Sequence, residues 1–167
     1  LLDDCKRFGT LAFAHAARSG FVATTLLKSF VAVGVFTQER QLEFMKSITT
    51  VAGQFENDKQ QYILGNMNIE DLLEIYGHLR PGTYDVGNQA YWENPDHFFV
   101  KNNTSTLLSY PKFEFSKDES ENIKKILIEL GGNHSPEGIL EYLQEAIQMR
   151  EFVKFEFTKN LSKALDL

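Results

Sequence analysis

The sequence predicts an all-α protein, because helical patterns cover most of the chain and strand patterns are almost absent. Apolar residues recur at helical spacing, and residues that cap helices precede these runs. The segment that most resembles a strand is KFEF, Lys112–Phe115. With 167 residues, 43% of them hydrophobic, the chain suits a single helical domain, 1–167, with its own core.

Residues 10–36, TLAFAHAARSGFVATTLLKSFVAVGVF, are apolar on nearly every helical face. This pattern predicts a long central buried helix that its neighbours wrap. Its length approaches that of a membrane span, but His15, Arg18 and Lys28 lie within it. An unpaired Arg near the centre of a span costs roughly 2.5 to 3.5 kcal/mol, so we expect no membrane insertion.

Thr37 is a cap residue before a second helix, whose apolar residues recur at three-to-four spacing. We expect its buried face to contain Leu42, Met45, Ile48, Val51 or Ala52, and Phe55. Asn68 then begins a short helix.

Gly77 follows the short helix where a left-handed cap is expected. Residues 78 to about 115 contain most of the prolines and many aromatic residues, which predicts a long ordered loop. Ser116 and Glu119 form a capping box for the next helix, which Gly131 ends. A long C-terminal helix follows Ser135.

The net charge is −6 and the isoelectric point is about 5.2, which argues against binding of nucleic acid or an anionic membrane. The single cysteine, Cys5, excludes an internal disulfide framework and favours a cytoplasmic location. The opening residues LLDDCKRFGT include no initiator methionine or signal pattern. We therefore expect an excised middle segment of a larger multidomain enzyme.

A basic cluster lies near the N-terminus. His15 and Arg18 are three residues apart and share a helix face. Arg7 lies within about 80° of that face if the helix extends back through Gly9. These groups suit an anion site. The alternative is structural: His15 is then a hydrogen-bonded core histidine, and Arg18 pairs with an internal carboxylate such as Asp71 or Asp85.

The segment YGHLRPGTYDV, residues 76–86, forms a second polar cluster. A turn after a helix end explains Pro81 and Gly82, because proline fixes φ and glycine accepts a positive φ. The turn does not explain the other polar residues. Their groups suit anion binding and acid-base chemistry, and they are His78, Arg80, Tyr84 and Asp85.

Several signatures are absent from the sequence. It contains no GxGxxG, no Walker A loop, no HExxH, no GxSxG and no His, Asp or Glu residues at metal-binding spacing. We expect no cofactor or metal in this segment, so a neighbouring domain would have to supply any nucleotide.

Three blocks carry a resemblance to a known family: DCKRFGTLAFAHAARSGF; YGHLRPGTYDV with WENPDHFF after it; and REFVKFEFTKNLSKALDL. They resemble the central helical region of phosphoenolpyruvate synthase-like, or PEP-utilising, phosphotransferases. This family includes rifampicin phosphotransferase-like proteins and amide or glutamine kinases. The resemblance spans most of the chain. One departure is Ala12, where the family pattern has proline.

The resemblance implies an enzyme of three parts. An ATP-grasp-like domain precedes this segment and binds ATP and Mg²⁺, and a swivelling domain with a phosphorylatable histidine follows it. This histidine carries a phosphoryl group from ATP to an acceptor on the helical domain. By this resemblance the chain is the substrate-binding, or acceptor-binding, domain of a cytoplasmic ATP-dependent kinase, and it is expected to be inactive in isolation.

The resemblance also implies site residues, because both polar clusters fall in its blocks. Arg80 and Arg18 would bind the acceptor carboxylate or the transferring phosphoryl group. His78 or Asp85 would position or deprotonate the acceptor. The candidate catalytic residues are therefore His78 and Asp85, and the candidate substrate-binding residues are Arg7, His15, Arg18, Arg80 and Tyr84.

Four aromatic residues of the loop could also line the acceptor pocket, although core packing is the simpler explanation: Tyr91, Trp92, Phe98 and Phe99. The acceptor stays open among a small amide or amino acid, pyruvate and a larger antibiotic-like molecule. Pyruvate is disfavoured because nothing in the chain resembles a barrel domain. The alternative function is a non-catalytic helical interaction or regulatory module.

Overall fold

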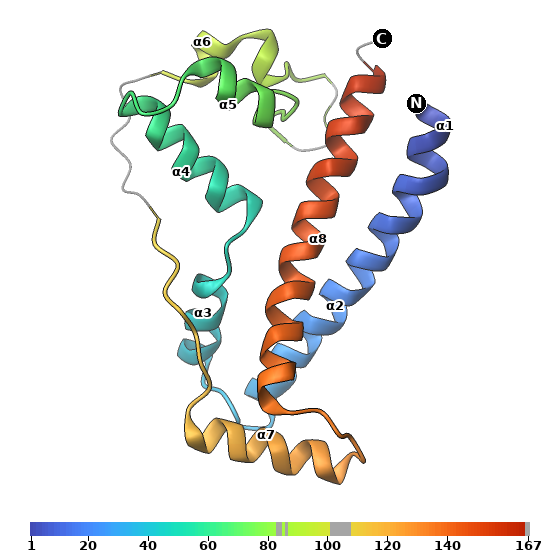
Figure 1. The fold of residues 1–167 in the computed structure, drawn as a ribbon, viewed down its shortest axis with the longest axis vertical. Coiled ribbons are helices and arrows are strands. Elements are labelled where there is room, and N and C mark those ends of the chain that lie inside the picture. Colours follow the sequence, from blue (N-terminus) through green and yellow to red (C-terminus); the bar gives the residue numbers. More distant parts are fainter. Residues whose placement is uncertain (83–84, 86, 101–107, 166–167) are drawn as a thin grey trace. The chain divides into compact units, whose positions relative to one another are not determined.

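The computed structural model describes residues 1–82, 85, 87–100 and 108–165, and it confirms the all-α prediction (Figure 1). The described part of the chain contains no strand, and Lys112–Phe115 is irregular. The elements are α1 (Leu2–Asp4), the π-helix η1 (Cys5–Gly9), α2 (Thr10–Ala32), α3 (Gln38–Ser47), α4 (Val51–Ile63), α5 (Ile69–Tyr76), the 3₁₀ helix η2 (Tyr91–Glu93), α6 (Pro95–Phe98), α7 (Lys117–Glu129) and α8 (Pro136–Leu165).

The chain divides into two compact units, and helices α2 and α8 contribute residues to both. Unit 1 comprises Leu1–Leu11, Thr50–Ser109 and Lys154–Leu167. Unit 2 comprises Ala12–Thr49 and Tyr110–Val153. That residues 1–167 form a single domain stays a prediction.

The helix caps follow the sequence closely. The side chains of Thr37, Asn68 and Ser116 each accept a hydrogen bond from a backbone N–H of the helix that follows, as predicted. The second predicted helix is wrong in one respect, because it breaks at Ile48 into α3 and α4. Thr50 caps α4 by accepting a hydrogen bond from the Gly53 N–H, so a second threonine cap begins a second helix.

The predicted apolar face of α3 is only partly correct. Phe44 and Ile48 are buried, whereas Leu42 and Met45 are exposed. The prediction is therefore confirmed for Ile48 and wrong for Leu42 and Met45, and the core contains Phe44, which was not predicted.

Helix α2 is less buried than predicted. Its buried residues form one stripe at alternating four- and three-residue spacing: Ala16, Gly20, Ala23, Leu27 and Phe30. Leu11, Phe21 and Val22 on other faces are more than half exposed, with 60%, 60% and 56% of their surface accessible. The expectation of a helix wrapped on all sides is therefore wrong. None of the described helices is long and apolar enough to cross a membrane.

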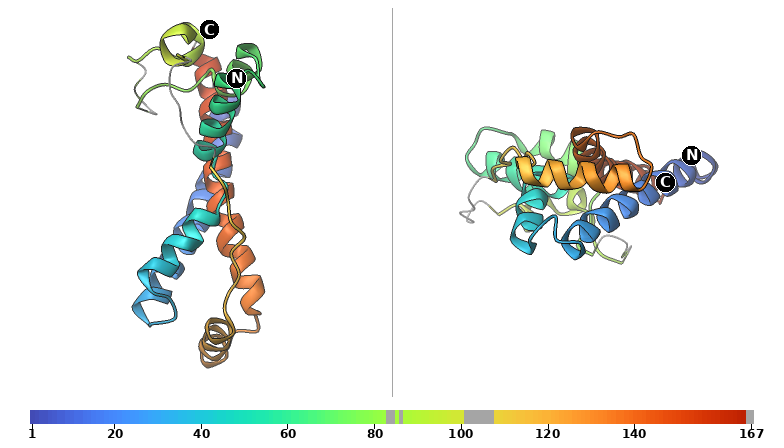
Figure 2. Two further views of the ribbon diagram at one scale, coloured as in Figure 1. Left: turned by 90° about the vertical axis from the view of Figure 1, so that its left-hand side faces the viewer. Right: turned by 90° about the horizontal axis from the view of Figure 1, so that it is seen from below.

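The core of unit 2 is built from phenylalanines. Phe36 packs edge-on against Phe30 and Phe113, and Phe44 packs edge-on against Phe113 at 5.2 Å between ring centroids. Helix α7 lies across α8, since the left view of Figure 2 shows α7 end-on and α8 along its length. Ile123 of α7 and Leu143 of α8 are both buried in this cluster.

Arg40 connects three segments of unit 2. Its Nε donates to the Glu119 carboxylate at 2.8 Å, and a terminal nitrogen donates to the Glu114 carbonyl. The guanidinium also lies 4.0 Å from the centre of the Phe113 ring. The Glu119 carboxylate raises the pKa of Arg40. Arg40 therefore holds α3, the segment before α7 and the capping box of α7 together.

The core of unit 1 is an aromatic cluster around α5. Phe55 stacks on Tyr91 at 5.6 Å and contacts Tyr76 edge-on at 5.0 Å. The Tyr76 hydroxyl donates to the Asp58 carboxylate at 2.7 Å, which joins α5 to α4. Phe99 is buried in the same cluster.

Three glycines were predicted to have special backbone roles. Gly82 and Gly131 have φ of 74° and 73°, as expected for a turn and a helix end. The left-handed prediction for Gly77 is wrong, because its φ is −56°. A Cβ at Gly77 would lie 3.0 Å from the Trp92 ring, so absence of a side chain permits close packing there.

Candidate small-molecule site

His78 is the most unusual of the predicted site residues. Only 2% of its surface is exposed, and neither ring nitrogen has a hydrogen-bond partner. The ring packs edge-on against Phe155 at 4.7 Å. Burial lowers its pKa to about 4, helped by the charges of Lys159 and Lys163 and opposed by a contact with the Ile75 backbone that falls short of hydrogen-bond geometry. His78 is therefore neutral near pH 7.

Arg80 and Asp85 take part in local interactions. A terminal nitrogen of Arg80 lies 3.1 Å from both the Glu93 carboxylate and the Asn88 carbonyl. The Asp85 carboxylate accepts hydrogen bonds from the Gly87 N–H at 2.9 Å and from the Asn88 amide at 3.2 Å. Both residues hold the turn in shape. Tyr84 lies outside the described residues.

The basic residues of the first cluster are all exposed. The helix does extend back through Gly9, but residues 5–9 form a π-helix, which changes the register assumed for Arg7. His15 and Arg18 are exposed on α2. The structural alternatives for this pair, a core histidine and a buried arginine, are therefore wrong.

The two polar clusters belong largely to different units. Arg7, His78, Arg80 and Asp85 lie in unit 1, and His15 and Arg18 lie in unit 2. Their convergence on one cavity stays a prediction.

The aromatic residues of the loop serve the core of unit 1. Tyr91, Phe98 and Phe99 belong to the cluster around α5. Trp92 lies against Gly77 and at 6.4 Å from the His78 ring. Core packing therefore accounts for their positions.

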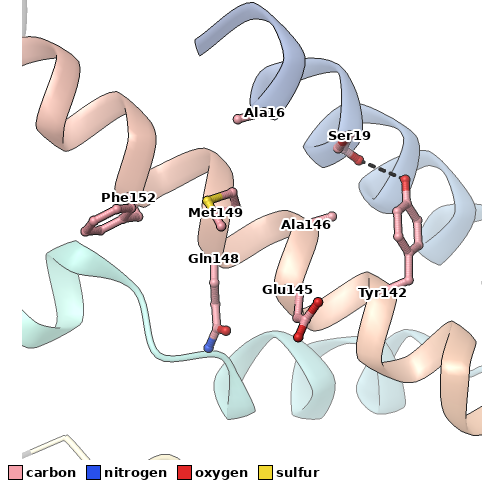
Figure 3. A pocket seen from close by; sticks show the side chains of 8 residues that line it. All are labelled: Ala16, Ser19, Tyr142, Glu145, Ala146, Gln148, Met149 and Phe152. Atoms are coloured by element: carbon pink, nitrogen blue, oxygen red, sulfur yellow. Dashed lines mark hydrogen bonds between the residues drawn. The ribbon is translucent and has the colours of Figure 1, made fainter. Parts of the chain in front are cut away.

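Sequence reasoning missed a pocket in unit 2 that residues of α2 and α8 line. Its volume is about 580 Å³, within the range of small-molecule sites. Figure 3 shows Ala146 and Met149 on the side of α8 that faces α2, with Glu145 and Gln148 projecting from the opposite side. The lining residues are Ala16, Ser19, Tyr142, Glu145, Ala146, Gln148, Met149 and Phe152.

Small residues of α2 leave room for this pocket and allow α2 and α8 to approach closely. A Cβ at Gly20 would lie 2.6 Å from Cδ and 3.0 Å from Cβ of Arg150, so only glycine allows this approach. The Tyr142 hydroxyl donates to the main-chain carbonyl of Ser19 at 3.3 Å. The sequence signal was the spacing of Ala16 and Gly20 on one helix face, which removes large side chains from two successive turns.

The third of the blocks that carry the family resemblance lies beside the first block in unit 2 and beside the second block in unit 1. In unit 2, Ser19 of the first block and Phe152 of the third line the same pocket. In unit 1, the Ser162 hydroxyl of the third block donates to the carbonyl of His78 in the second at 3.4 Å. Segments far apart in sequence therefore pack together on α8.

Other features offer weaker sites. A pocket of about 300 Å³ lies beside Cys5 in unit 1, where Lys6 and Asp3 also line it. Among the described residues there is no group of three or more His, Cys, Asp or Glu side chains placed to bind a metal ion. Comparison of the chain with known protein families, with curated proteins and with solved structures finds no match.

Proposed function

We propose that this chain is the acceptor-binding helical domain of an ATP-dependent phosphotransferase of the phosphoenolpyruvate synthase-like type. The observation that carries the proposal is the pocket of unit 2, which residues of the first and third resembling blocks line together. A pocket with apolar walls and a few polar groups suits a small organic acceptor.

The sequence also supports a division of labour between domains. The chain contains no phosphate-binding loop of a familiar type, so ATP and Mg²⁺ would bind to a neighbouring ATP-grasp-like domain. A histidine on a swivelling domain would carry the phosphoryl group to the acceptor. Overall, ATP, water and the acceptor would give the phosphorylated acceptor, AMP and phosphate.

The roles proposed for individual residues differ in their support. His78 keeps its candidate role because its two ring nitrogens are unpaired. Arg80 and Asp85 would act only after leaving their present partners within the turn. Because Arg80 and Asp85 already have partners within the turn, a second candidate function is also supported. It is a non-catalytic helical interaction module in which the turn is structural.

Phosphoryl transfer tests the proposal directly. We would supply ATP and a panel of hydroxyl, amine, amide and carboxylate acceptors to the polypeptide that joins this chain to the two proposed neighbouring domains. Acceptor-dependent release of AMP is expected. A Ser19→Trp change fills the pocket and should reduce that release at least tenfold, whereas Ser29→Trp places the same side chain at an exposed position of α2 outside the pocket.

The role of Arg80 needs a structural control, because Arg80→Ala also removes the contact with Glu93. Glu93→Gln breaks the ion pair and keeps the guanidinium. If Arg80 binds the acceptor or phosphoryl group, Arg80→Ala should lose turnover and Glu93→Gln should retain it. Equal loss in both variants would assign Arg80 to structure, and full turnover in Ser19→Trp would remove the pocket from the mechanism.

A further inference from the structure

The pocket of unit 2 also indicates the chemistry of its ligand. Its apolar surface comes from Ala16, Ala146, Met149 and Phe152, and among the described residues that line it Glu145 alone has a formal charge at neutral pH. We propose that this pocket binds an apolar small molecule that carries a protonated amine or a related cation, with the Glu145 carboxylate as its counter-ion. This inference rests on the proposed function, because it names the class of acceptor.

The charge distribution disfavours an anionic ligand. Among basic residues near the pocket in sequence, Arg150 forms an ion pair with Glu151 at 3.3 Å and lies 5.2 Å from the centre of the Phe21 ring. Arg150 does not line the pocket, and neither does Arg18. A carboxylate in the pocket would therefore face Glu145 without a compensating cation among the lining side chains. Pyruvate and the carboxylate of a free amino acid fit poorly.

The apolar side chains suit the body of such a ligand. Met149 and Phe152 line the pocket with 52% and 53% of their surface exposed, so a ligand can cover apolar area on both. An aromatic ring such as that of Phe152 can attract a cation over its face, and the thioether of Met149 adapts to ligands of different shape. Helix α8 thus supplies apolar contact from the side that faces α2, and the Glu145 carboxylate lines the pocket from the opposite side of α8.

The neutral polar groups favour a ligand that donates hydrogen bonds. The Tyr142 hydroxyl donates its one proton to the Ser19 carbonyl, which leaves the lone pairs of its oxygen for a ligand. Gln148 and Glu145 project from the same side of α8 in Figure 3. The amide oxygen of Gln148 and the carboxylate of Glu145 are both acceptors. An ammonium group supplies the donors that these oxygens lack.

Three related compounds separate charge from apolar contact: 2-phenylethylamine, neutral 2-phenylethanol and anionic 3-phenylpropanoate. The chain contains three methionines, so protein labelled with ¹³C at the methionine methyl groups gives three signals. Met149 lines the pocket and reports binding there, and Met45 and Met67 are internal controls because they line no part of it. A Met149→Leu variant assigns the signal.

The amine should shift the Met149 signal along a saturable curve, and the neutral compound should bind more weakly. Glu145→Gln should weaken binding of the amine about two- to fivefold, the range expected for an exposed charge pair, and leave the alcohol unchanged. Glu141→Gln removes an exposed carboxylate from the same helix outside the pocket and should have no effect. Binding of the carboxylate as tightly as the amine, or absence of any Met149 shift, would overturn the inference.

Failure of this inference can be distinguished from failure of the proposed function. If the full enzyme phosphorylates a carboxylate acceptor and Ser19→Trp abolishes that transfer, the function stands and the cation preference is wrong. If the amine binds at Met149 but no acceptor releases AMP, the pocket stands as a binding site for cationic ligands and the phosphotransferase proposal is wrong.

Discussion

The two units differ in the partners that one buried polar side chain in each of them has. In unit 2, Arg40 is partly buried, and its guanidinium is paired with carboxylates of Glu119 and Glu43 and with a backbone carbonyl. In unit 1, His78 is more deeply buried, and its ring nitrogens are unpaired. Arg40 therefore stabilises unit 2, whereas unit 1 contains a group whose protonation opposes folding.

An unpaired buried imidazole and a paired guanidinium affect stability in different ways. A protein usually hydrogen-bonds its buried polar groups, and an exception has a cost in stability that function can explain. The unpaired imidazole lies in one of the blocks with family resemblance, whereas Arg40 lies outside them.

The largest predicted effect follows from the phenylalanine core of unit 2. Phe44 is fully buried, so Phe44→Ala should destabilise the chain by about 3 to 5 kcal/mol. The single tryptophan, Trp92, lies in unit 1 and reports on that unit alone, whereas circular dichroism reports on all helices. If 1–167 is one cooperative domain, the urea unfolding transitions followed by Trp92 and by circular dichroism should shift together in this variant.

Separate transitions would contradict the single-domain prediction. In that case Phe44→Ala would move the dichroism signal of unit 2 and leave the Trp92 transition unchanged. Phe21→Ala is the control, because Phe21 is 60% exposed, and its effect should be below about 1 kcal/mol.

The next effect concerns the pH response of unit 1. The pKa of His78 is about 4 in the folded chain, below the usual value of 6.5, so the unfolded chain binds the proton more tightly. The stability that depends on an unprotonated His78 is fully present above pH 6.5 and is lost as the pH falls through 4. Its size is at most about 3 kcal/mol.

Urea unfolding followed by dichroism between pH 7.5 and pH 4 measures this contribution. The difference between the wild-type chain and His78→Phe should grow in favour of the variant as the pH falls, because phenylalanine fits the aromatic surroundings and does not titrate. Carboxylates titrate equally in both proteins and cancel. A constant difference across this pH range would show that the imidazole is not buried and unpaired.

Arg40 should show a smaller effect that does not depend on pH in this way. Arg40→Met keeps a long unbranched side chain at this position and removes the interactions of the guanidinium with Glu119, Glu114 and the Phe113 ring, so we expect a loss of about 2 kcal/mol. Glu43 is 61% exposed, and Glu43→Gln should cost less than about 0.5 kcal/mol. Thermal unfolding distinguishes them, and equal effects would remove the connecting role of Arg40.

The sequence predicted the elements of the fold better than their packing. Local signals such as the caps at Thr37 and Ser116 depend on hydrogen bonds within a few residues, so they are visible in the sequence. The burial of α2 depends on which neighbours pack against it. Leu11 and Phe21 therefore look like core residues in the sequence and are exposed in the structure.

The candidate sites, like the packing of the helices, depend on contacts between distant segments that the sequence does not reveal. His78 was identified from its place in a polar turn, but its burial against Phe155 depends on a helix far away in sequence. The pocket of unit 2 was missed because its residues come from two helices at opposite ends of the chain, and most of them are ordinary helix-forming residues. Spacing within one helix does not reveal a partner helix.

The smallest predicted effect tests the close approach of α2 and α8 that brings the walls of the pocket together. Alanine normally favours a helix over glycine by about 1 kcal/mol. Gly138→Ala on α8 should realise part of that gain, since its new Cβ would lie no closer than 3.4 Å to Ser135. Gly20→Ala should instead be neutral or destabilising by up to about 1 kcal/mol, because the new Cβ would contact Arg150 at 2.6 Å and 3.0 Å and the stem of that side chain must move. Thermal unfolding of the pair compares the two positions, and a stabilisation of Gly20→Ala equal to that of Gly138→Ala would mean that α2 and α8 do not approach so closely.

The methionine spectrum of Gly20→Ala then shows whether the pocket depends on that approach. A shift of the Met149 signal with unchanged Met45 and Met67 signals is expected, because Gly20 and Met149 lie on the facing sides of the two helices.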